Sequence, residues 1–286
     1  MDDKDWMVLK ILHEEKNITK TAERLFVSQP ALTYRLQQIE KEFDAKLFIR
    51  NKKGVEFTSQ GEALVRHANK LVLQLRQIKE TIKSMEDKVQ GVLRLAVSNN
   101  FARFRLPHLL KIFLQNYPDV EFHVQTGWSS DLIQLVTKEE VHIGIVRGDF
   151  NWIGERYLLM EESVCIASKD ELSLDKLPSL PRINYKTDPH LKYTIDNWWQ
   201  SRYSEPPLIT MEVDRIETCR EMVLNGLGYG IFPSISLGEN DNLWIHPIQI
   251  NNQPVVRKTW LIYWKDTLQM KNASAFVEFL KNLKTH

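Results

Sequence analysis

Apolar residues near the start of the chain recur at helical spacing on both sides of a short break. Two helices are predicted before the break, at 3–16 and 18–25. Beyond it, an apolar stripe with intervals of four, three and four residues predicts a longer helix. The stripe consists of Leu32, Leu36, Ile39 and Phe43. Three helices in this order predict a helix-turn-helix.

The longer helix is predicted to begin at Gln29 and to turn a polar face outward. Ser28 can cap it, and Pro30 falls in the first turn, where a missing backbone N–H costs nothing. Amide, guanidinium and hydroxyl groups can read base edges in the major groove of DNA. The residues that we expect to contact DNA are Gln29, Pro30, Ala31, Thr33, Tyr34, Arg35 and Gln37.

A two-stranded wing is predicted directly after this helix, because residues 46–57 read as two short strands around a turn that contains Gly54. The segment from Lys16 to Thr58 holds nine basic and five acidic residues, a net charge of +4 in a chain whose total is +1. We therefore expect the wing to contact phosphates, through Arg50, Lys52 and Lys53. A solvated helical hairpin would also present a basic face, so charge alone leaves that alternative open.

A heptad pattern follows the wing and predicts a long helix. Two sets of apolar residues each repeat every seven positions, one from Leu64 to Met85 and the other from Ala68 to Val89. The residues around them are almost all polar. This favours a coiled coil between two chains over packing within one domain. A dimer would present two recognition helices to the two halves of a pseudo-palindromic operator. The residues predicted to pair are Leu64, Leu71, Leu75, Ile78, Ile82 and Met85.

From Gly91 onward, predicted strands alternate with predicted helices. The strands are 92–97, 120–126, 142–146, 163–167, 208–213 and 260–264. The helices are 103–116, 131–137, 193–202, 216–224 and 273–283. Alternation of this kind predicts parallel sheets with helices on their faces, arranged here in two lobes.

Specific strings in the chain resemble the LysR-type transcriptional regulators. Residues 21–48, TAERLFVSQPALTYRLQQIEKEFDAKLF, are similar to the DNA-binding motif of this family, although Thr21-Ala22 stands where the family often has paired Ala. Further matches lie in the second part of the chain: Leu106-Pro107, Tyr117-Pro118, Gly127, 142–145 and the run GLGYGIFP at 226–233. His142 stands where the family usually has an acidic residue, and we interpret it as a packed or hydrogen-bonded residue at the strand edge.

The resemblance covers essentially the whole chain and implies an α/β protein with a winged N-terminal part. The expected domains are a winged helix-turn-helix at 1–58, a coiled-coil linker helix at 59–90 and a two-lobed effector-binding domain at 91–286, similar to periplasmic solute-binding proteins. We place the first lobe at about 91–160 and 266–286, and the second at about 161–265. The implied partners are double-stranded DNA, a small-molecule effector and further copies of the chain, as a homodimer or homotetramer.

Polar residues stand at the predicted C-terminal ends of the strands, where ligands bind in open α/β sheets. Ser98 and Asn100 match positions that commonly contact effectors in the family. The expected effector contacts are Ser98, Asn99, Asn100, Thr126 and Arg147, and their hydroxyl, amide and guanidinium groups suit a small carboxylate or other anion. Alternatively, Ser98 and Asn99 only cap a helix and Arg147 pairs with a surface acid. From the second lobe we add Tyr185 and the turn at 214–218.

Other functional classes find little support in the sequence. The chain has no apolar run of 18 residues and begins with an acidic segment, so we expect no membrane contact and a cytoplasmic location. Cys165 and Cys219 have no CxxC or His-pair context, and we expect neither a metal nor a cofactor. Catalytic motifs such as GxSxG, HExxH and the P-loop are missing, which argues against an enzyme. A free-standing solute-binding protein would need a secretion signal and no basic helix-turn-helix.

Overall fold

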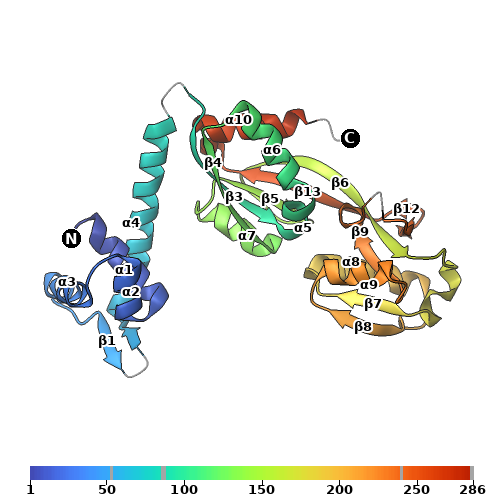
Figure 1. The fold of residues 1–286 in the computed structure, drawn as a ribbon, viewed down its shortest axis with the longest axis horizontal. Coiled ribbons are helices and arrows are strands. Elements are labelled where there is room, and N and C mark those ends of the chain that lie inside the picture. The colour runs from blue at the N-terminus through green and yellow to red at the C-terminus, as the bar shows by residue number, and fades with distance from the viewer. Residues whose placement is uncertain (52–53, 85–87, 239–240, 284–286) are drawn as a thin grey trace. The chain divides into compact units, whose positions relative to one another are not determined.

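The protein forms two compact units in a computed structural model, residues 1–83 and 84–286 (Figure 1). The structure describes residues 1–51, 54–84, 88–238 and 241–283. Of the predicted site residues, Lys52, Lys53 and Met85 lie outside the described residues. Within the described residues, no helix combines the length and the apolar character needed to cross a membrane.

The first unit is a winged helix-turn-helix, as predicted. Its elements are α1 (Asp3–Glu15), α2 (Ile18–Arg24), α3 (Gln29–Glu42), β1 (Phe48–Asn51), β2 (Gly54–Phe57) and α4 (Ser59–Ser84). Ser28 caps α3, because its Oγ accepts a hydrogen bond from the N–H of Ala31, and Pro30 lies in the first turn. Leu32, Leu36 and Ile39 are buried, whereas Phe43, the fourth member of the predicted stripe, follows the end of the helix and is 44% exposed.

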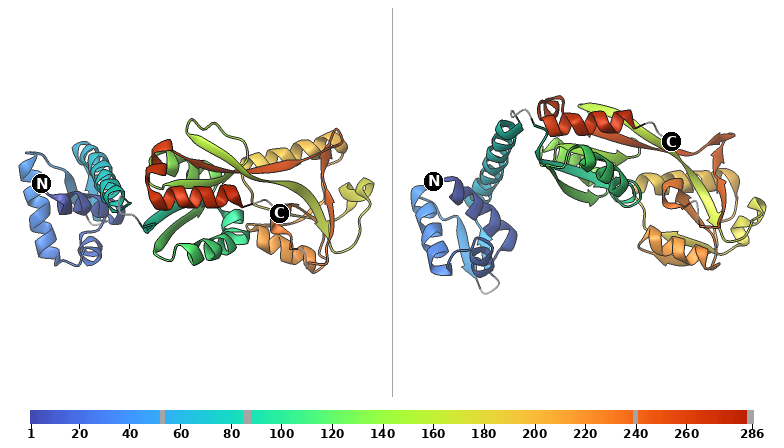
Figure 2. Two further views of the ribbon diagram at one scale, coloured as in Figure 1. Left: turned by 90° about the horizontal axis from the view of Figure 1, so that it is seen from above. Right: turned by 45° about the horizontal axis from the view of Figure 1, so that its top comes forward.

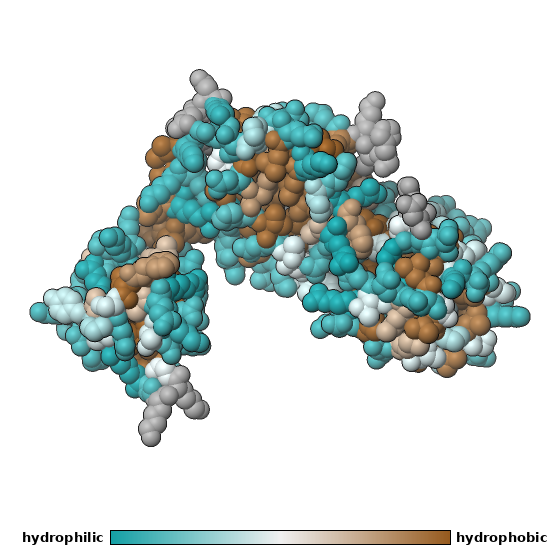
Figure 3. Space-filling view, viewed as in Figure 1, coloured by the Kyte–Doolittle hydropathy of each residue, from teal (hydrophilic) through white to brown (hydrophobic). Residues whose placement is uncertain are grey.

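Helix α4 divides into a packed first half and an exposed second half. Val65 and Ala68 are buried, and Ala68 packs into the core of the winged domain. Leu71, Ile78 and Ile82 are 40%, 57% and 62% exposed, and Figure 3 shows hydrophobic atoms on the surface over this helix.

The predicted heptad pattern extends too far at its C-terminal end. Val89 lies beyond the helix, which ends at Ser84, and it packs against the core of the second unit. It is therefore not part of the helical stripe.

The first lobe of the second unit is built around β3. Its elements are β3 (Gly91–Ser98), α5 (Asn99–Phe104), α6 (Leu106–Asn116), β4 (Val120–Gly127), α7 (Ser129–Thr137) and β5 (Ile143–Arg147). Strand β3 runs parallel to both β4 and β5. The helix predicted at 103–116 is two helices, because Pro107 has no N–H with which to bond the carbonyl of Arg103. The interpretation of His142 as a packed or hydrogen-bonded residue is confirmed, because its Nδ1 accepts a hydrogen bond of 3.1 Å from the N–H of Arg94.

The second lobe continues the α/β pattern. Its strands are β7 (Arg182–Tyr185), β8 (Ile209–Val213), β9 (Gly230–Pro233), β10 (Trp244–Pro247), β11 (Gln249–Ile250) and β12 (Gln253–Pro254). Its α-helices are α8 (Pro189–Arg202) and α9 (Ile216–Leu224), and short 3₁₀ helices lie at Leu174–Ser179, Ser234–Ser236 and, near the end of the chain, Lys265–Gln269. Residues from α8 and α9 belong to separate hydrophobic clusters, one containing Ile195 and Ile231 and the other Cys219 and Ile183.

Two long antiparallel strands run through both lobes, β6 (Glu155–Ser168) and β13 (Val256–Tyr263), as Figure 2 shows. They make one mixed sheet in the order β10-β6-β13-β5-β3-β4, with β9 also paired to β6. The prediction of parallel sheets is therefore right only for β4-β3-β5 and for β7-β8, because apolar strand patterns do not encode strand direction.

The predicted lobe boundary also needs correction. Leu261 and Tyr263 fall within the predicted second lobe at 161–265, yet they belong to the core of the first, where β13 pairs with β5. The closing helix α10 (Lys271–Asn282) returns to the first lobe as predicted, and its Phe276 is fully buried there.

Replacing Phe113 with Ala tests the packing of the first lobe. Phe113 is fully buried, with its ring centroid 5.0 Å from that of Phe276. Phe113→Ala should lower the free energy of unfolding by about 3–5 kcal/mol, because it leaves a cavity in a closed aromatic cluster. Urea unfolding of the intact chain measures this loss. Tyr193→Ala, at a residue that is 66% exposed, is the control, and equal effects of the two variants would contradict this packing.

Candidate functional site

The outer face of α3 presents the predicted DNA-contacting residues together. Gln29, Pro30, Ala31, Tyr34 and Gln37 are exposed, and Thr33 and Arg35 are half-buried. The buried stripe on the opposite side holds the helix in place, so these polar side chains stand outward on a rigid element. The arrangement can place amide and hydroxyl groups against base edges.

Arg35 differs from its neighbours on α3 because it is tied to α1. Its Nε and Nη2 donate hydrogen bonds to the two carboxylate oxygens of Asp5, with 2.7 Å between Nη2 and Oδ2. Nη2 also lies 3.0 Å from Asp2 Oδ2. The hydrogen bond to Asp5 is the main cause that raises the pKa of Arg35. Because Asp5 is only 1% exposed, its carboxylate requires such a partner.

The wing is attached to the end of α1. The N–H of Val55 donates a hydrogen bond of 2.8 Å to the carbonyl of Lys16. Gly54, with φ of +130°, permits this approach, since a Cβ at this position would lie 2.3 Å from the same carbonyl oxygen. Arg50 is exposed on β1 and available to a phosphate.

A cleft in the second unit gathers most of the predicted effector contacts. Ser98, Asn99, Asn100 and Arg147 line it from the first lobe. The residues of the second lobe on the opposite wall include Tyr185, Lys186, Thr187, Asp188, Asp214, Arg215, Ile216 and Glu217. The second-lobe residues expected from the sequence, Tyr185 and most of the turn at 214–218, are thus brought to the first-lobe set.

Thr126 is not among the residues that line this cleft. It is exposed, and β4 continues past it to Gly127. The residues that reach the cleft from this strand end are therefore Gly127, Trp128 and Ser129.

Arg147 forms a buried ion pair with Glu162 of β6, and both side chains are 2% exposed. Glu162 also accepts a hydrogen bond of 3.0 Å from the N–H of Ile235. Ser129 Oγ accepts a 2.9 Å hydrogen bond from the N–H of Arg147. Burial, followed by repulsion from Arg257, lowers the pKa of Arg147 to about 9. The partner of Arg147 is therefore an acid in the interior, not the surface acid considered from the sequence.

A second buried arginine, Arg257 of β13, lies in the same cleft. Its Nη2 donates to Asp188, whose other oxygen caps α8 through the N–H of Leu191 at 3.0 Å. Burial alone would raise the pKa of the Asp188 carboxyl, but Arg257, the N–H of Leu191 and Arg147 together hold this pKa below its usual value. Sequence reasoning missed both residues. A charged residue at the start of a largely apolar strand is the signal that could have identified Arg257.

Some polar atoms of the cleft are buried without a partner. Within the part of the chain that the structure describes, Ser98 Oγ and Arg257 Nε have no hydrogen bond. Both atoms can donate a hydrogen bond, and leaving a buried donor unsatisfied costs about 1–3 kcal/mol. The cleft thus offers one unused donor on Ser98 and another on the guanidinium group of Arg257, beside the guanidinium group of Arg147.

Two family models match the chain. The model described as "Bacterial regulatory helix-turn-helix protein, lysR family" matches residues 4–62, and the model described as "LysR substrate binding domain" matches residues 86–284. The chain belongs to the LysR family of transcriptional regulators. It therefore has a DNA-binding domain and an effector-binding domain, and it is a regulator, not an enzyme.

Relatives agree with this assignment, and solved structures share the fold. The chain is 47% identical to the HTH-type transcriptional regulator YraN of Bacillus subtilis over 98% of both chains. It is 36% identical to the regulator YkuM of the same organism, over 96% of this chain and 95% of that one. The structure of full-length CbnR with its target DNA has a TM-score of 0.71 at 18% identity, covering 98% of this chain and 99% of that chain. The full-length structure of the virulence activator AphB of Vibrio cholerae has a TM-score of 0.64 at 15% identity, and the match covers all of both chains. The two structures show that the fold is shared.

Removing the Arg35 side chain should destabilise the winged domain. Arg35→Ala leaves the carboxylate of Asp5 buried without its partner, which should lower the free energy of unfolding by about 2 kcal/mol. The double variant Asp5→Ala with Arg35→Ala should recover part of this loss, because it leaves no unpaired charge. Thermal unfolding compares these variants with Arg50→Ala, which changes an exposed arginine. If Arg35→Ala melted like Arg50→Ala, the pair with Asp5 would have no role in stability.

Proposed function

We propose that the chain reads a pseudo-palindromic operator in double-stranded DNA as a homodimer or homotetramer, under the control of a small anion bound in the cleft. The observation that carries the DNA-reading part is the exposed polar face of α3 opposite its buried stripe. CbnR, whose fold this chain shares, was solved with its target DNA, which supports DNA binding by this chain. A cytoplasmic location, where bacterial DNA lies, belongs to the proposal.

The residues of the winged domain have different proposed roles. Base edges are contacted by Gln29, Thr33, Tyr34 and Gln37. Pro30 and Ala31 lie in the first turn of α3, the end of the helix that comes closest to the DNA. Arg50, Lys52 and Lys53 contact phosphates. Arg35 positions α3 against α1 because Asp5 and Asp2 engage its Nε and Nη2. This role differs from the direct base contact that the sequence suggested.

Pairing of two chains is proposed through the second half of α4. The exposed apolar residues Leu71, Ile78 and Ile82 need cover, and a second copy of the same helix presents the same surface. Leu75 is half-buried on the same helix, and Met85 continues the spacing in sequence. Leu64 has a different position, because it packs against the winged domain of its own chain.

The proposed effector is an anion held by Ser98, Asn99, Asn100 and the two buried arginines. A small carboxylate could accept hydrogen bonds from Ser98 Oγ and Arg257 Nε, which have no partner among the described residues. The effector would favour one arrangement of the lobes, and it can shift that balance only by its differential affinity for the two arrangements. Thr126 has no part in this proposal.

Substituting Gln29 tests base reading by α3. Gln29→Ala should reduce the preference for operator over random DNA, by about 1–3 kcal/mol, because a bidentate amide contact to a base is lost. Stability should not change, since Gln29 is exposed. Fluorescence anisotropy with both duplexes at the same salt concentration measures the preference. An equal loss of affinity for both duplexes would remove Gln29 from base reading.

Charged substitutions in the second half of α4 test whether this surface pairs two chains. Leu71→Glu combined with Ile78→Glu should convert the assembly to monomers at micromolar concentration, because two carboxylates would face their symmetry mates in an apolar seam. Sedimentation velocity measures the mass. Lys70→Glu with Lys79→Glu is the control at exposed polar positions of the same helix. A Leu71→Glu, Ile78→Glu protein that stays associated would show that α4 is not the main contact.

A panel of small anions tests the cleft. One carboxylate, phosphate or sulfate compound should raise the melting temperature of the full chain by several degrees, because it binds only the folded state. Ser98→Ala should weaken the binding of that compound about five- to tenfold, because it removes one hydrogen bond and leaves every charge paired. Ser130→Ala, on the exposed surface of α7, should leave binding unchanged. If no anion shifted the midpoint, or if Ser98→Ala bound normally, an anion site at these residues would be ruled out.

A further inference from the structure

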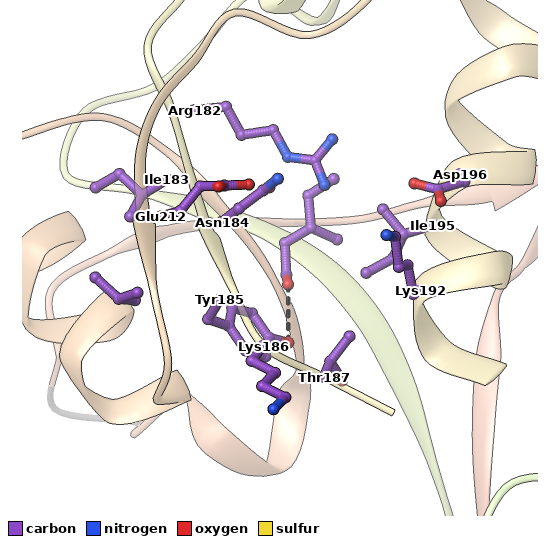
Figure 4. A pocket seen from close by; sticks show the side chains of 12 residues that line it. Arg182, Ile183, Asn184, Tyr185, Lys186, Thr187, Lys192, Ile195, Asp196 and Glu212 are labelled. Carbon is purple, nitrogen blue, oxygen red and sulfur yellow. Dashed lines mark hydrogen bonds between the residues drawn. The ribbon is translucent and has the colours of Figure 1, made fainter. Parts of the chain in front are cut away.

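A second cavity, of about 380 Å³, lies within the second lobe between α8 and the strands β7 and β8 (Figure 4). This volume is in the range of small-molecule sites. The cavity shares Tyr185, Lys186 and Thr187 with the effector cleft, but its other lining residues are separate. Of the expected effector contacts, Tyr185 belongs to this shared part, whereas Ser98, Asn99, Asn100, Arg147 and Arg257 do not line the cavity.

The strands present polar residues to this cavity, where a sheet covered by a helix is normally apolar. In β7, Ile183 belongs to the hydrophobic cluster around α9, and its neighbours Arg182 and Asn184 line the cavity on the side of α8. In β8, Met211 packs into that same cluster, and Glu212 lines the cavity. Glu212 and Asn184 are partners in the register of the two strands.

The first lobe shows what an ordinary interior looks like at the equivalent place. There, a helix that follows the first strand packs on a parallel pair, and the space is filled by Phe113 and Phe122 with ring centroids 5.7 Å apart. Part of the space under α8 is filled in the same way, because Trp198 and Trp199 of α8 pack in a hydrophobic cluster with Tyr229. The cavity adjoins this cluster through Ile195 and Ile231, and the polar side chains on its other walls are the feature that needs an explanation.

Arg182 is the most buried charge in the cavity. Its residue is 7% exposed, and its guanidinium carbon lies 5.4 Å from the ring centroid of Trp199. Its Nε is buried and has no hydrogen-bond partner in the described part of the chain. Figure 4 shows the Arg182 guanidinium near Asn184 and Glu212, with Asp196 and Lys192 of α8 on the other side of the cavity.

The charged residues that line the cavity are of both signs, and they do not form ion pairs with one another. Among described residues, no ion pair within 4.0 Å joins Arg182, Lys192, Asp196 or Glu212 to any partner. The guanidinium of Arg182 is buried with its Nε unsatisfied, so it favours an anionic group of a ligand. Asp196 and Glu212 are exposed residues of the same lining and offer negative charge to a cationic group of that ligand.

We propose that this cavity binds a small zwitterion of the α-amino acid type. The ligand carboxylate pairs with Arg182, whose planar guanidinium can donate two parallel hydrogen bonds to it. The ligand ammonium group donates to the carboxylates of Asp196 and Glu212, and the Asn184 amide can bond either end of the ligand. The site is additional to the effector cleft and does not depend on an anion binding there.

The test screens the twenty common L-α-amino acids against the full chain by thermal unfolding and measures affinity for any that bind by calorimetry. At least one should raise the midpoint by several degrees. Glu212→Gln and Asp196→Asn change exposed residues, so both variants should fold normally. Each should weaken the binding of that amino acid about tenfold, which corresponds to about 1.4 kcal/mol. Glu171→Gln, an exposed acid of the same lobe outside the cavity, should bind normally.

Two further comparisons identify the ligand class and the cavity. The analogue of the bound amino acid that lacks its ammonium group, and the analogue that lacks its carboxylate, should each bind at least tenfold more weakly. The proposal is overturned if no amino acid binds, if Glu212→Gln and Asp196→Asn bind normally, or if either analogue binds as well as the amino acid. If Ser98→Ala abolishes binding and the two acid variants do not, the amino acid occupies the cleft, which also overturns this second site.

Discussion

A buried charge requires a partner, and both units of the protein depend on this constraint. In the winged domain, the carboxylate of Asp5 is satisfied by Arg35, so that α1 and α3 are held by an ion pair as well as by apolar packing. In the second unit, Arg147 and Glu162 join the end of β5 to β6. Each pair connects an element that carries a proposed ligand contact to an element behind it.

The cleft gains its chemistry from the same constraint. The two long strands β6 and β13 pass through both lobes and bring Glu162 and Arg257 to the strand ends of the first lobe. Arg257 in turn holds Asp188, which caps α8 of the second lobe. The buried charges of the cleft are thus attached to both lobes, and the ion pair of Arg257 with Asp188 changes if one lobe moves relative to the other. A ligand bound among them has a physical route to favour one arrangement.

The local features of this fold were predictable from the sequence, and the long-range features were not. The helix limits of the winged domain, the Ser28 cap and the strands of the wing follow from spacing and from residue types with local preferences. The break at Pro107 was also a local signal, which the apolar periodicity of 103–116 concealed. By contrast, the antiparallel pairing of β13 joins segments about a hundred residues apart, and no periodicity encodes it.

The same division applies to the site. Ser98, Asn99, Asn100 and Arg147 could be named because strand ends meet at one edge of a parallel sheet. The partners of the charged residues could not, since Asp5 and Arg35 are thirty positions apart and Asp188 and Arg257 are sixty-nine apart. Thr126 was misplaced by a shift of one or two residues at the end of β4. The polar lining under α8 was missed because alternating polar residues in a strand are normally read as a solvent-facing side.

Selection of DNA from a random pool tests the central claim, that the full chain is a paired reader of DNA sequence. Duplexes with a random central segment are incubated with the protein, and the bound fraction is sequenced over several rounds. The account predicts enrichment of two inverted copies of one short half-site, with their centres separated by a whole number of helical turns, about 10 base pairs each. A bound fraction with no sequence enrichment, or with a single half-site that has no inverted partner, would contradict it.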